Sequence, residues 1–155
     1  MYIVDKKSDQ KDQIEIVPIE LDDLKRVPKS KFWFDWREEI NYDVFKLQIS
    51  GTDEILGLIS METHHQDSRL EIRLLAASKE NRGKNKKFDR LVGNLIAFAC
   101  IRSITMFGSL ACVSLVPKTR LIDHYREEYS MIEAGKSLFL DGKELLEIIK
   151  RFGDE

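Results

Sequence analysis

Three consecutive stretches in the middle of the chain alternate between apolar and polar residues. They are residues 44–50 (VFKLQIS), 55–63 (ILGLISMET) and 70–77 (LEIRLLAA). Alternation with a period of two is typical of strands that bury one face. Gly51, Thr52 and Asp53 give turn chemistry between the first two stretches. The pattern therefore predicts a three-stranded antiparallel meander.

The period of the pattern changes after this meander. Apolar or small residues then recur at helical spacing, at Phe88, Leu91, Leu95, Ala99 and Ser103. Gly108 stands where a C-cap glycine belongs. We expect a helix over residues 88–107 whose first turn begins near Lys86. The next stretch, 110–116 (LACVSLV), is almost continuously apolar, which favours a strand buried on both faces.

The flanking regions predict shorter elements. Residues 1–4 read as a short strand, 5–13 as a polar, mobile lead-in, and 14–19 as a strand with Pro18 at its end or at a sheet edge. A short helix over 21–27 should stop at Pro28, and most aromatic side chains of 32–36 should point inward. We expect a helix over 118–129, two short strands within 131–140 and an amphipathic helix over 143–152. This order indicates an α+β (mixed α/β) fold in a single domain spanning 1–155.

Composition supports one compact domain and argues against a protein that coats nucleic acid. The 155 residues are 43% hydrophobic and 34% charged, with 25 basic and 27 acidic side chains and a formal net charge of −2. A chain of this length buries roughly 68–70% of its unfolded surface. Proteins that coat nucleic acid usually carry a basic excess.

The cysteines and the apolar runs bear on the compartment. Cys100 and Cys112 lie in apolar runs without metal-ligand spacing, which indicates buried thiols in a reducing environment. The sequence shows no signal peptide, and we see no apolar run near the roughly 20 residues that a membrane helix needs. We therefore expect a cytoplasmic protein without a membrane contact.

A basic segment precedes the expected central helix. Residues 79–94 (KENRGKNKKFDRLVGN) begin with five basic side chains within nine positions, which are Lys79, Arg82, Lys84, Lys86 and Lys87. A strand, a short loop with Gly83 and a helix N-terminus together favour anion binding, because the first helical turn offers unpaired N–H groups. We interpret residues 82–88 as an anion site. A solvated charged loop and a nucleic-acid contact are the alternatives.

The basic loop resembles the pyrophosphate loop of GNAT-type N-acetyltransferases, whose pattern is Q/R-x-x-G-x-G/A after the fourth strand. Arg82 matches the first position, whereas Asn85 and Lys87 replace the later glycine or alanine positions. Asn tolerates a left-handed backbone, but Lys87 cannot imitate the close approach that glycine allows. A lysine there would instead reach a phosphate with its ammonium group.

A second segment carries the same resemblance. Residues 118–135 (KTRLIDHYREEYSMIEAG) are similar to the family's N-x-x-A-x-x-L-Y-E-K-L-G-F segment. Lys118 stands at the Asn position, Leu121 at the Ala and Tyr125 at the Tyr, while Ser130 and Met131 replace Gly-Phe. The resemblance covers roughly residues 14–140, more by the order of elements than by identical residues.

The resemblance implies both a fold and a cofactor. The fold would be a mostly antiparallel sheet of six to seven strands, splayed between its fourth and fifth strands and flanked by helices. Acetyl-CoA would lie in the splay, with its pantetheine arm paired to the backbone of Ala76 and Ala77 and its pyrophosphate on the loop. The other residues implied in cofactor binding are Arg82, Gly83, Lys84, Asn85, Lys86, Lys87 and Lys118.

The resemblance also implies catalytic roles. An amine would attack the thioester directly, with Tyr125 as the acid for the thiolate, since a phenol with a pKa near 10 is protonated at neutral pH; Tyr129 is its alternate. Glu71 is the candidate base, and Glu62 is an alternative. Strand alternation places Glu71 on the face of Arg73, opposite Ile72 and Leu74. An exposed, cross-paired glutamate is the competing interpretation.

The histidines and aromatic residues are less specific. His64 and His65 point to opposite faces of an extended chain, and no third ligand has suitable spacing, so we expect no metal site. His124 is expected at the surface. In the family, the region that holds the aromatic residues 32–36 forms the wall of the acceptor site, which makes them a candidate substrate lining.

Three functions remain open from the sequence. The first is an acetyl-CoA-dependent N-acetyltransferase that acts on an unidentified small-molecule or protein amine. The second is a catalytically inactive, GNAT-like module that binds CoA or another protein, which the altered loop motif favours. The third is contact with tRNA, which the overall charge and the acidic runs disfavour. Dimerisation is common among such domains, so a homodimer is a further expectation.

Overall fold

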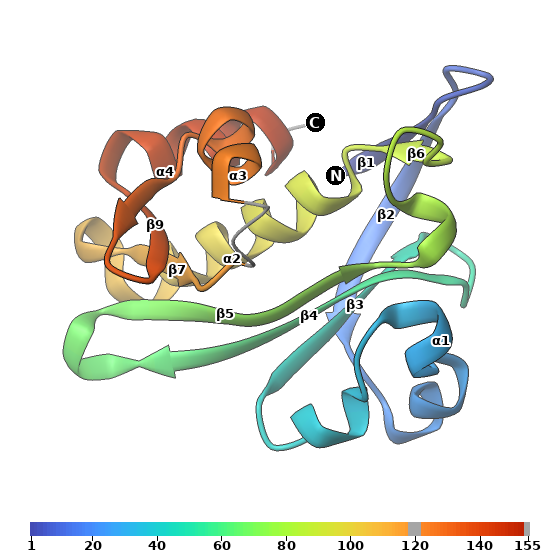
Figure 1. The fold of residues 1–155 in the computed structure, drawn as a ribbon, viewed down its shortest axis with the longest axis horizontal. Helices are drawn as coiled ribbons and strands as arrows, with labels where there is room; N and C mark the ends of the chain where they lie inside the picture. Colours follow the sequence, from blue (N-terminus) through green and yellow to red (C-terminus); the bar gives the residue numbers. More distant parts are fainter. Residues whose placement is uncertain (118–121, 154–155) are drawn as a thin grey trace.

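The fold is built on one curved sheet. The computed structural model describes residues 1–117 and 122–153, and its nine strands lie in the order β6-β1-β2-β3-β4-β5-β7-β9-β8 (Figure 1). The strands are β1 (Tyr2–Asp5), β2 (Lys11–Pro18), β3 (Asp43–Ile49), β4 (Ile55–His64), β5 (Arg69–Ala77), β6 (Phe88–Asp89), β7 (Cys112–Leu115), β8 (Ile132–Ala134) and β9 (Ser137–Asp141). Among the described residues, only β5 and β7 pair in parallel. The expected α+β fold is confirmed, with more strands than the six to seven that the resemblance implied. The short strand expected over residues 1–4 is present as β1, whereas β6 was not expected.

Helices cover both faces of the sheet. They are α1 (Lys29–Phe32), α2 (Leu91–Phe107), α3 (Ile122–Tyr129) and α4 (Gly142–Ile148), with the shorter turns η1 (Leu21–Arg26), η2 (Trp36–Glu39), η3 (His65–Asp67), η4 (Lys79–Asn81), η5 (Gly108–Leu110) and the π-helical turn η7 (Ile149–Gly153). Figure 1 shows α2 on one side of β4 and β5 and α1 on the other. We call the side that carries α1, η1 and η2 the front face.

The central meander is confirmed. Strands β3, β4 and β5 follow the three alternating stretches and pair antiparallel in sequence order. The turn between β3 and β4 contains Gly51 at φ +82°, a backbone conformation that costs glycine little because it has no Cβ.

The N-terminal stretch and α2 differ from expectation. Residues 5–13, expected as a mobile lead-in, instead contain the end of β1, a turn and the start of β2. The helix expected from Phe88 begins at Leu91, because Phe88 and Asp89 pair with β1 as β6 and Arg90 takes a left-handed conformation at φ 76°. Its C-cap at Gly108 is confirmed, with the Gly108 N–H donating to the Ile104 carbonyl.

Helix α2 is central to the core. By length and composition, Leu91–Leu110 is apolar enough to cross a membrane, so the expectation that no stretch approaches that length was wrong. Half of this stretch is nevertheless buried within the molecule, with Leu95, Ile96 and Ala99 fully enclosed. Such burial is that of a helix packed against a sheet.

Two apolar clusters lie on the two faces. The larger one joins α2 to side chains of β4, β5 and β7, among them Ile59, Ile72 and Val113. The smaller one lies on the front face, where Phe32 and Trp36 are at most 2% exposed. Most of the aromatic stretch therefore points inward, as predicted.

The pairing between β5 and β7 stops partway along β5, and we call the unpaired side of β5 beyond this point the gap. The two strands pair only from Arg69–Cys112 to Ile72–Leu115, and in Figure 1 β5 continues beyond the end of β7. The predicted splay between these strands is confirmed, and it leaves the second half of β5 along one side of the gap.

Candidate functional site

The open edge of β5 is the first component of the site. Within the described residues, positions 73–77 have a strand partner only on the β4 side. The Ser78 N–H donates to the Leu56 carbonyl, and Gly57 lies opposite Ala77. Because backbone groups alternate in direction along a strand, Leu75 and Ala77 turn their N–H and C=O groups to the gap, while Ala76 turns to β4. The open edge is thus formed by Leu75 and Ala77, contrary to the expectation for Ala76.

A β-bulge lies at the point where β5 leaves β7. Ser60 pairs with Leu74 and Met61 pairs with Ile72, so Arg73 is an extra residue on β5. A bulge reverses the alternation of the strand beyond it. Leu74 therefore packs into the front-face cluster, on the same face as Arg73, and the expectation that it lies opposite Arg73 was wrong.

Trp33 occupies part of the open edge. Its indole Nε1–H donates to the Ala77 carbonyl at 2.9 Å. Two cations of the basic segment lie over its ring. The Arg82 guanidinium carbon is 4.5 Å and Lys79 Nζ is 5.2 Å from the ring centroid. Trp33 thus links the front-face segment to both the strand edge and the basic loop. This contact was not predictable from the sequence, since an aromatic-rich stretch indicates burial without indicating a partner.

The basic loop has a defined frame. Asn81 is 4% exposed and donates from Nδ2 to Ser78 Oγ at 2.8 Å, while its Oδ1 accepts from the Phe88 N–H. Gly83 sits at φ +78°, and the Lys6 N–H donates to the Lys87 carbonyl, which ties the loop to the β1–β2 turn. Sequence reasoning missed Asn81, because an isolated asparagine in a charged loop carries no distinguishing pattern.

The predicted residues of the loop differ in exposure. Arg82, Gly83, Lys84, Asn85 and Lys87 are exposed, and half-buried Lys86 pairs with Asp89 at 3.1 Å. The prediction that the loop leads directly into the first turn of α2 was wrong, because β6 and Arg90 intervene. That turn packs instead against the C-terminal segment, where a Cβ on Gly93 would lie 2.3 Å from the Phe152 ring.

Tyr125 lies on α3, where it packs against the core and beside the Tyr129 ring. Burial raises the pKa of its phenol, and the nearby Arg82 guanidinium acts in the opposite direction, so the two side chains lie within electrostatic reach. Tyr129 is 6% exposed and belongs to the core, where burial strongly raises its pKa. Tyr125 is thus the better placed of the two tyrosines, and His124 is exposed as expected.

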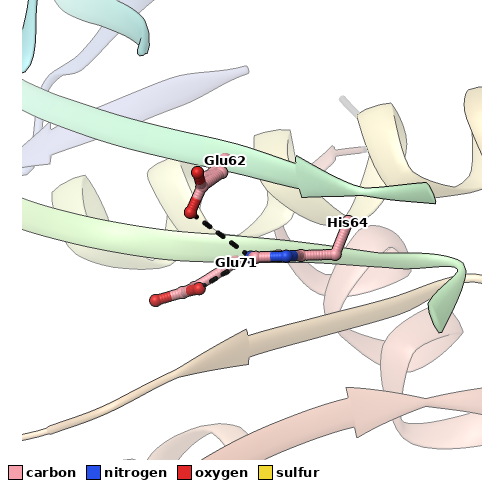
Figure 2. A group of neighbouring side chains, drawn as sticks. All are labelled: Glu62, His64 and Glu71. Carbon is pink, nitrogen blue, oxygen red and sulfur yellow. Dashed lines mark hydrogen bonds and ion pairs between the residues drawn. The ribbon is translucent and has the colours of Figure 1, made fainter. Parts of the chain in front are cut away.

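A cluster of three titratable side chains lies on β4 and β5 (Figure 2). His64 Nε2 is 2.8 Å from Glu71 Oε1 and 3.4 Å from Glu62 Oε1. Since an ionised carboxylate only accepts hydrogen bonds, the shorter contact requires a hydrogen on Nε2. His65 turns away and meets the Phe107 ring edge-on, so the prediction of opposite faces for the two histidines is confirmed. The structure thus joins both candidate bases, Glu62 and Glu71, through His64.

Further charged groups surround this cluster. Arg69 Nη1 is 3.7 Å from Glu71 Oε1, and Arg73 Nη1 is 3.8 Å from Glu62 Oε1. Arg73 is also paired to Glu39 at 3.0 Å, Arg69 is paired to Asp67 at 3.3 Å, and hydrogen bonding to Glu39 raises the pKa of Arg73. Glu39, Ser60 and Arg73 form a continuous network, because Ser60 Oγ donates to Glu39 Oε1.

The cluster is suited to a proton more than to a metal ion. The ligand atoms of Glu62, His64 and Glu71 lie within 4.8 Å of one another, a spacing that admits a cation. Arg69 and Arg73, however, already bring two positive charges to the two carboxylates. A divalent ion would have to displace or oppose them, whereas a proton adds a single charge.

A hollow on the front face adjoins the network. It has a volume of about 310 Å³, and Trp36, Ile40, Tyr42 and Asp43 are among the residues that line it. The Arg73 guanidinium lies 3.6 Å from the centroid of the Tyr42 ring. Tyr42 therefore connects the hollow to the charged network beside the bulge, and sequence reasoning did not single it out.

Two remaining predictions concern Lys118 and the cysteines. Lys118 lies outside the described residues, as does Leu121.

Cys100 is buried and Cys112 half-buried, both are free thiols, and burial raises the pKa of Cys100 to about 12. A thiol with such a pKa is uncharged at neutral pH, so Cys100 is a packing residue.

Similar folds occur among solved structures. Mutant forms of the spermidine/spermine N-acetyltransferase SpeG from Vibrio cholerae match with a TM-score of 0.63 at 17% identity, covering 87% of this chain and 98% of theirs. A dodecameric structure of this spermidine N-acetyltransferase gives 0.61 at 17% identity, covering 83% and 93%. SpeG in complex with manganese ions gives 0.58 at 17% identity, covering 83% and 92%.

Comparisons by sequence add nothing to the structural match. No protein-family model and no curated protein matches the chain. The structures of SpeG, a GNAT-superfamily N-acetyltransferase, are similar over most of their length. The chain therefore has the GNAT fold, and its function has to be argued from its own site.

Proposed function

We propose that this protein is an acetyl-CoA-dependent N-acetyltransferase that acts on an amine. The observation that carries the proposal is the open edge of β5, which begins at the Arg73 bulge and ends beside the basic loop. An extended chain with amide groups can pair with such an edge as an added strand would. The pantetheine arm of CoA is such a chain, and its phosphates would then reach the loop.

The residues present fit this cofactor. Leu75 and Ala77 offer backbone groups toward the gap, and Arg82, Lys84 and Lys87 are exposed cations at its outer end. Arginine and lysine form strong charge-assisted hydrogen bonds with phosphate oxygens. The Ala77 carbonyl is engaged by Trp33, so a pantetheine amide can pair there only when the indole moves.

Glu71 near the bulge and Tyr125 on α3 would supply the proton chemistry. Acetyl-CoA, when bound, supplies an acetyl thioester that an uncharged amine attacks directly. Glu71, oriented by His64, accepts the proton that the ammonium group must lose before its nitrogen bonds to the carbonyl carbon. As the carbon–sulfur bond breaks, Tyr125 donates its phenolic proton to the sulfur, and the second proton that the nitrogen loses on becoming an amide restores the phenol.

The acceptor would approach over the front face. The hollow beside Tyr42 offers aromatic walls, which favour a cationic amine through cation–π contacts. Spermidine is the first amine to test, because the similar structures are spermidine N-acetyltransferases.

Thiol release from acetyl-CoA, followed across a panel of polyamines, amino acids and aromatic amines, tests the proposal. We expect at least one amine to give turnover, and Tyr125→Phe to lower kcat by about 100-fold or more while acetyl-CoA still binds, as for loss of a general acid. No turnover with any amine would oppose the enzyme assignment. Full turnover by Tyr125→Phe would remove Tyr125 as the acid.

A second candidate function is a module that binds CoA without catalysis. Asn85 and Lys87 replace small residues of the loop motif, and the Trp33 indole already bonds to the Ala77 carbonyl. Binding of acetyl-CoA without thiol release across the panel would favour this function.

A further inference from the structure

Trp33 stands at the junction of the strand edge and the phosphate loop. Its Nε1–H bonds to the Ala77 carbonyl at 2.9 Å, which is one of the backbone groups that turn toward the gap. Trp36, three positions later, is a core residue that is 2% exposed. Its Nε1–H donates to the Phe32 carbonyl at 3.0 Å. Of the two tryptophans of the chain, Trp36 therefore packs in the core, whereas Trp33 bonds to the open edge of β5.

The backbone of Trp33 is held in an uncommon conformation. Its φ is +75° and its ψ is −35°, at the C-cap of α1, where its N–H donates to the Lys29 carbonyl at 2.8 Å. A bulky side chain rarely adopts positive φ, and such strain persists only where the surroundings determine it. Strained positions are concentrated at sites that bind ligands or change shape.

The indole also engages the basic segment. Arg82 lies at 4.5 Å and Lys79 at 5.2 Å from the ring centroid, within the range of a cation–π contact. The charge of Arg82 also lowers the pKa of Tyr125, against the effect of burial. The Trp33 side chain thus contacts both the Ala77 carbonyl and the Arg82 guanidinium, two groups that the proposed cofactor would also contact.

We propose that Trp33 competes with acyl-CoA for the open edge of β5 and so sets its affinity for this cofactor. In the empty protein the indole N–H takes the Ala77 carbonyl and its ring holds Arg82. When the cofactor binds, a pantetheine amide replaces the indole at Ala77, and Arg82 turns to a phosphate. This inference rests on the proposed function, because it needs acyl-CoA in the gap.

Trp33→Phe isolates the competing hydrogen bond. Phenylalanine keeps a ring beneath Arg82 but lacks the N–H donor. Because a net hydrogen bond corresponds to about a 2- to 12-fold change in an equilibrium constant, acetyl-CoA should bind to the variant more tightly by that factor in calorimetry. Thermal unfolding of the variant shows whether its fold is retained.

The wild-type protein provides an independent measurement. With fluorotryptophan incorporated, its two tryptophans give two fluorine resonances, and the Trp33→Phe variant identifies the one that belongs to Trp33. Saturating acetyl-CoA should shift the Trp33 resonance and leave that of buried Trp36 nearly unchanged.

The outcomes separate the two claims. If wild type binds acetyl-CoA but Trp33→Phe binds equally or more weakly, or the Trp33 resonance does not move, the competition is refuted and the proposed function stands. If neither protein binds acetyl-CoA, the proposed function fails and the competition fails with it.

Discussion

At the scale of the residue, Tyr125 shows how burial prepares a side chain to donate a proton. Removing a phenol from water disfavours its ionised form, which raises the pKa of Tyr125, although Arg82 partly opposes this. The phenol therefore stays protonated throughout the neutral range. If Tyr125 is the acid, the alkaline fall in kcat should lie above the ordinary phenol value of about 10.

Glu71 is the proposed proton acceptor, the counterpart of the proton donor Tyr125. Glu71→Gln keeps the shape of the side chain but removes the group that accepts a proton. We expect kcat at neutral pH to fall by about 100-fold or more, as is typical for loss of a general base, with a smaller change in KM. Steady-state kinetics between pH 6 and pH 9, roughly the range that holds the ordinary pKa values of histidines and α-amino groups, measures this.

Glu62→Gln is the matched control. Glu62 lies farther from His64, at 3.4 Å against 2.8 Å for Glu71, and it is paired to Arg73. It should lose less activity than Glu71→Gln. The reverse order would transfer the base to Glu62, and equal activity of both variants with wild type would exclude a base in this cluster.

At the scale of the element, η1 is fastened to β3 by a buried ion pair. Asp23 is 1% exposed, and its Oδ2 lies 2.7 Å from Lys46 Nζ. Burial alone would raise the pKa of Asp23, but hydrogen bonds from Lys46, the Glu20 N–H and Arg26 outweigh it, so the pKa is lowered. The pair holds the front-face segment that carries Trp33 and Trp36.

Asp23→Asn should therefore destabilise the fold. The change leaves Lys46, which is 7% exposed, without its charged partner, and breaking a buried pair costs about 3–5 kcal/mol. Because the pKa of Asp23 is lowered on folding, this contribution is complete above the unfolded value of 3.8 and is lost as pH falls through the lower, folded value. Urea unfolding at pH 7 and at pH 3 measures the difference from wild type.

Asp22→Asn serves as the control, since Asp22 is exposed in the same turn. It should change the free energy of unfolding by less than about 0.5 kcal/mol. An Asp23→Asn variant as stable as wild type at pH 7 would show that the Lys46 contact contributes nothing.

Strand alternation and helical spacing were sufficient to predict the main elements. The stretches at 44–50, 55–63 and 70–77 became β3, β4 and β5 because each has one strongly apolar face. The bulge at Arg73 and the left-handed Arg90 were not predictable in this way. The bulge lies in the pairing of β5 with β4, and Arg90 follows the pairing of β6 with the distant β1. Neither residue is of a type that favours its conformation.

At the scale of the whole molecule, the site is assembled from segments far apart in sequence. Trp33 meets Ala77 across 44 positions, and Arg73 meets Glu39 across 34. Glu71, Arg82 and Tyr125 were each predicted as candidates through the resemblance of their segments to the family. It did not reveal Trp33, His64 or Asn81 as contacts, because such pairings follow from how the strands twist and pack.

The central claim is that the gap beside β5 and the basic loop together bind acetyl-CoA. Titration calorimetry of acetyl-CoA on wild type and on the double variant Arg82→Ala, Lys87→Ala tests it most directly. The variant Lys143→Ala, Lys150→Ala is the control, because it removes the same charge from exposed positions elsewhere.

We predict clear binding to wild type and to the control. The loop variant should bind at least about tenfold more weakly, because losing one charge-assisted contact typically costs about 1.5–3 kcal/mol. Absence of binding to wild type, or equal binding by the loop variant, would contradict the account: the first outcome would exclude the cofactor, and the second would exclude the loop as its phosphate site.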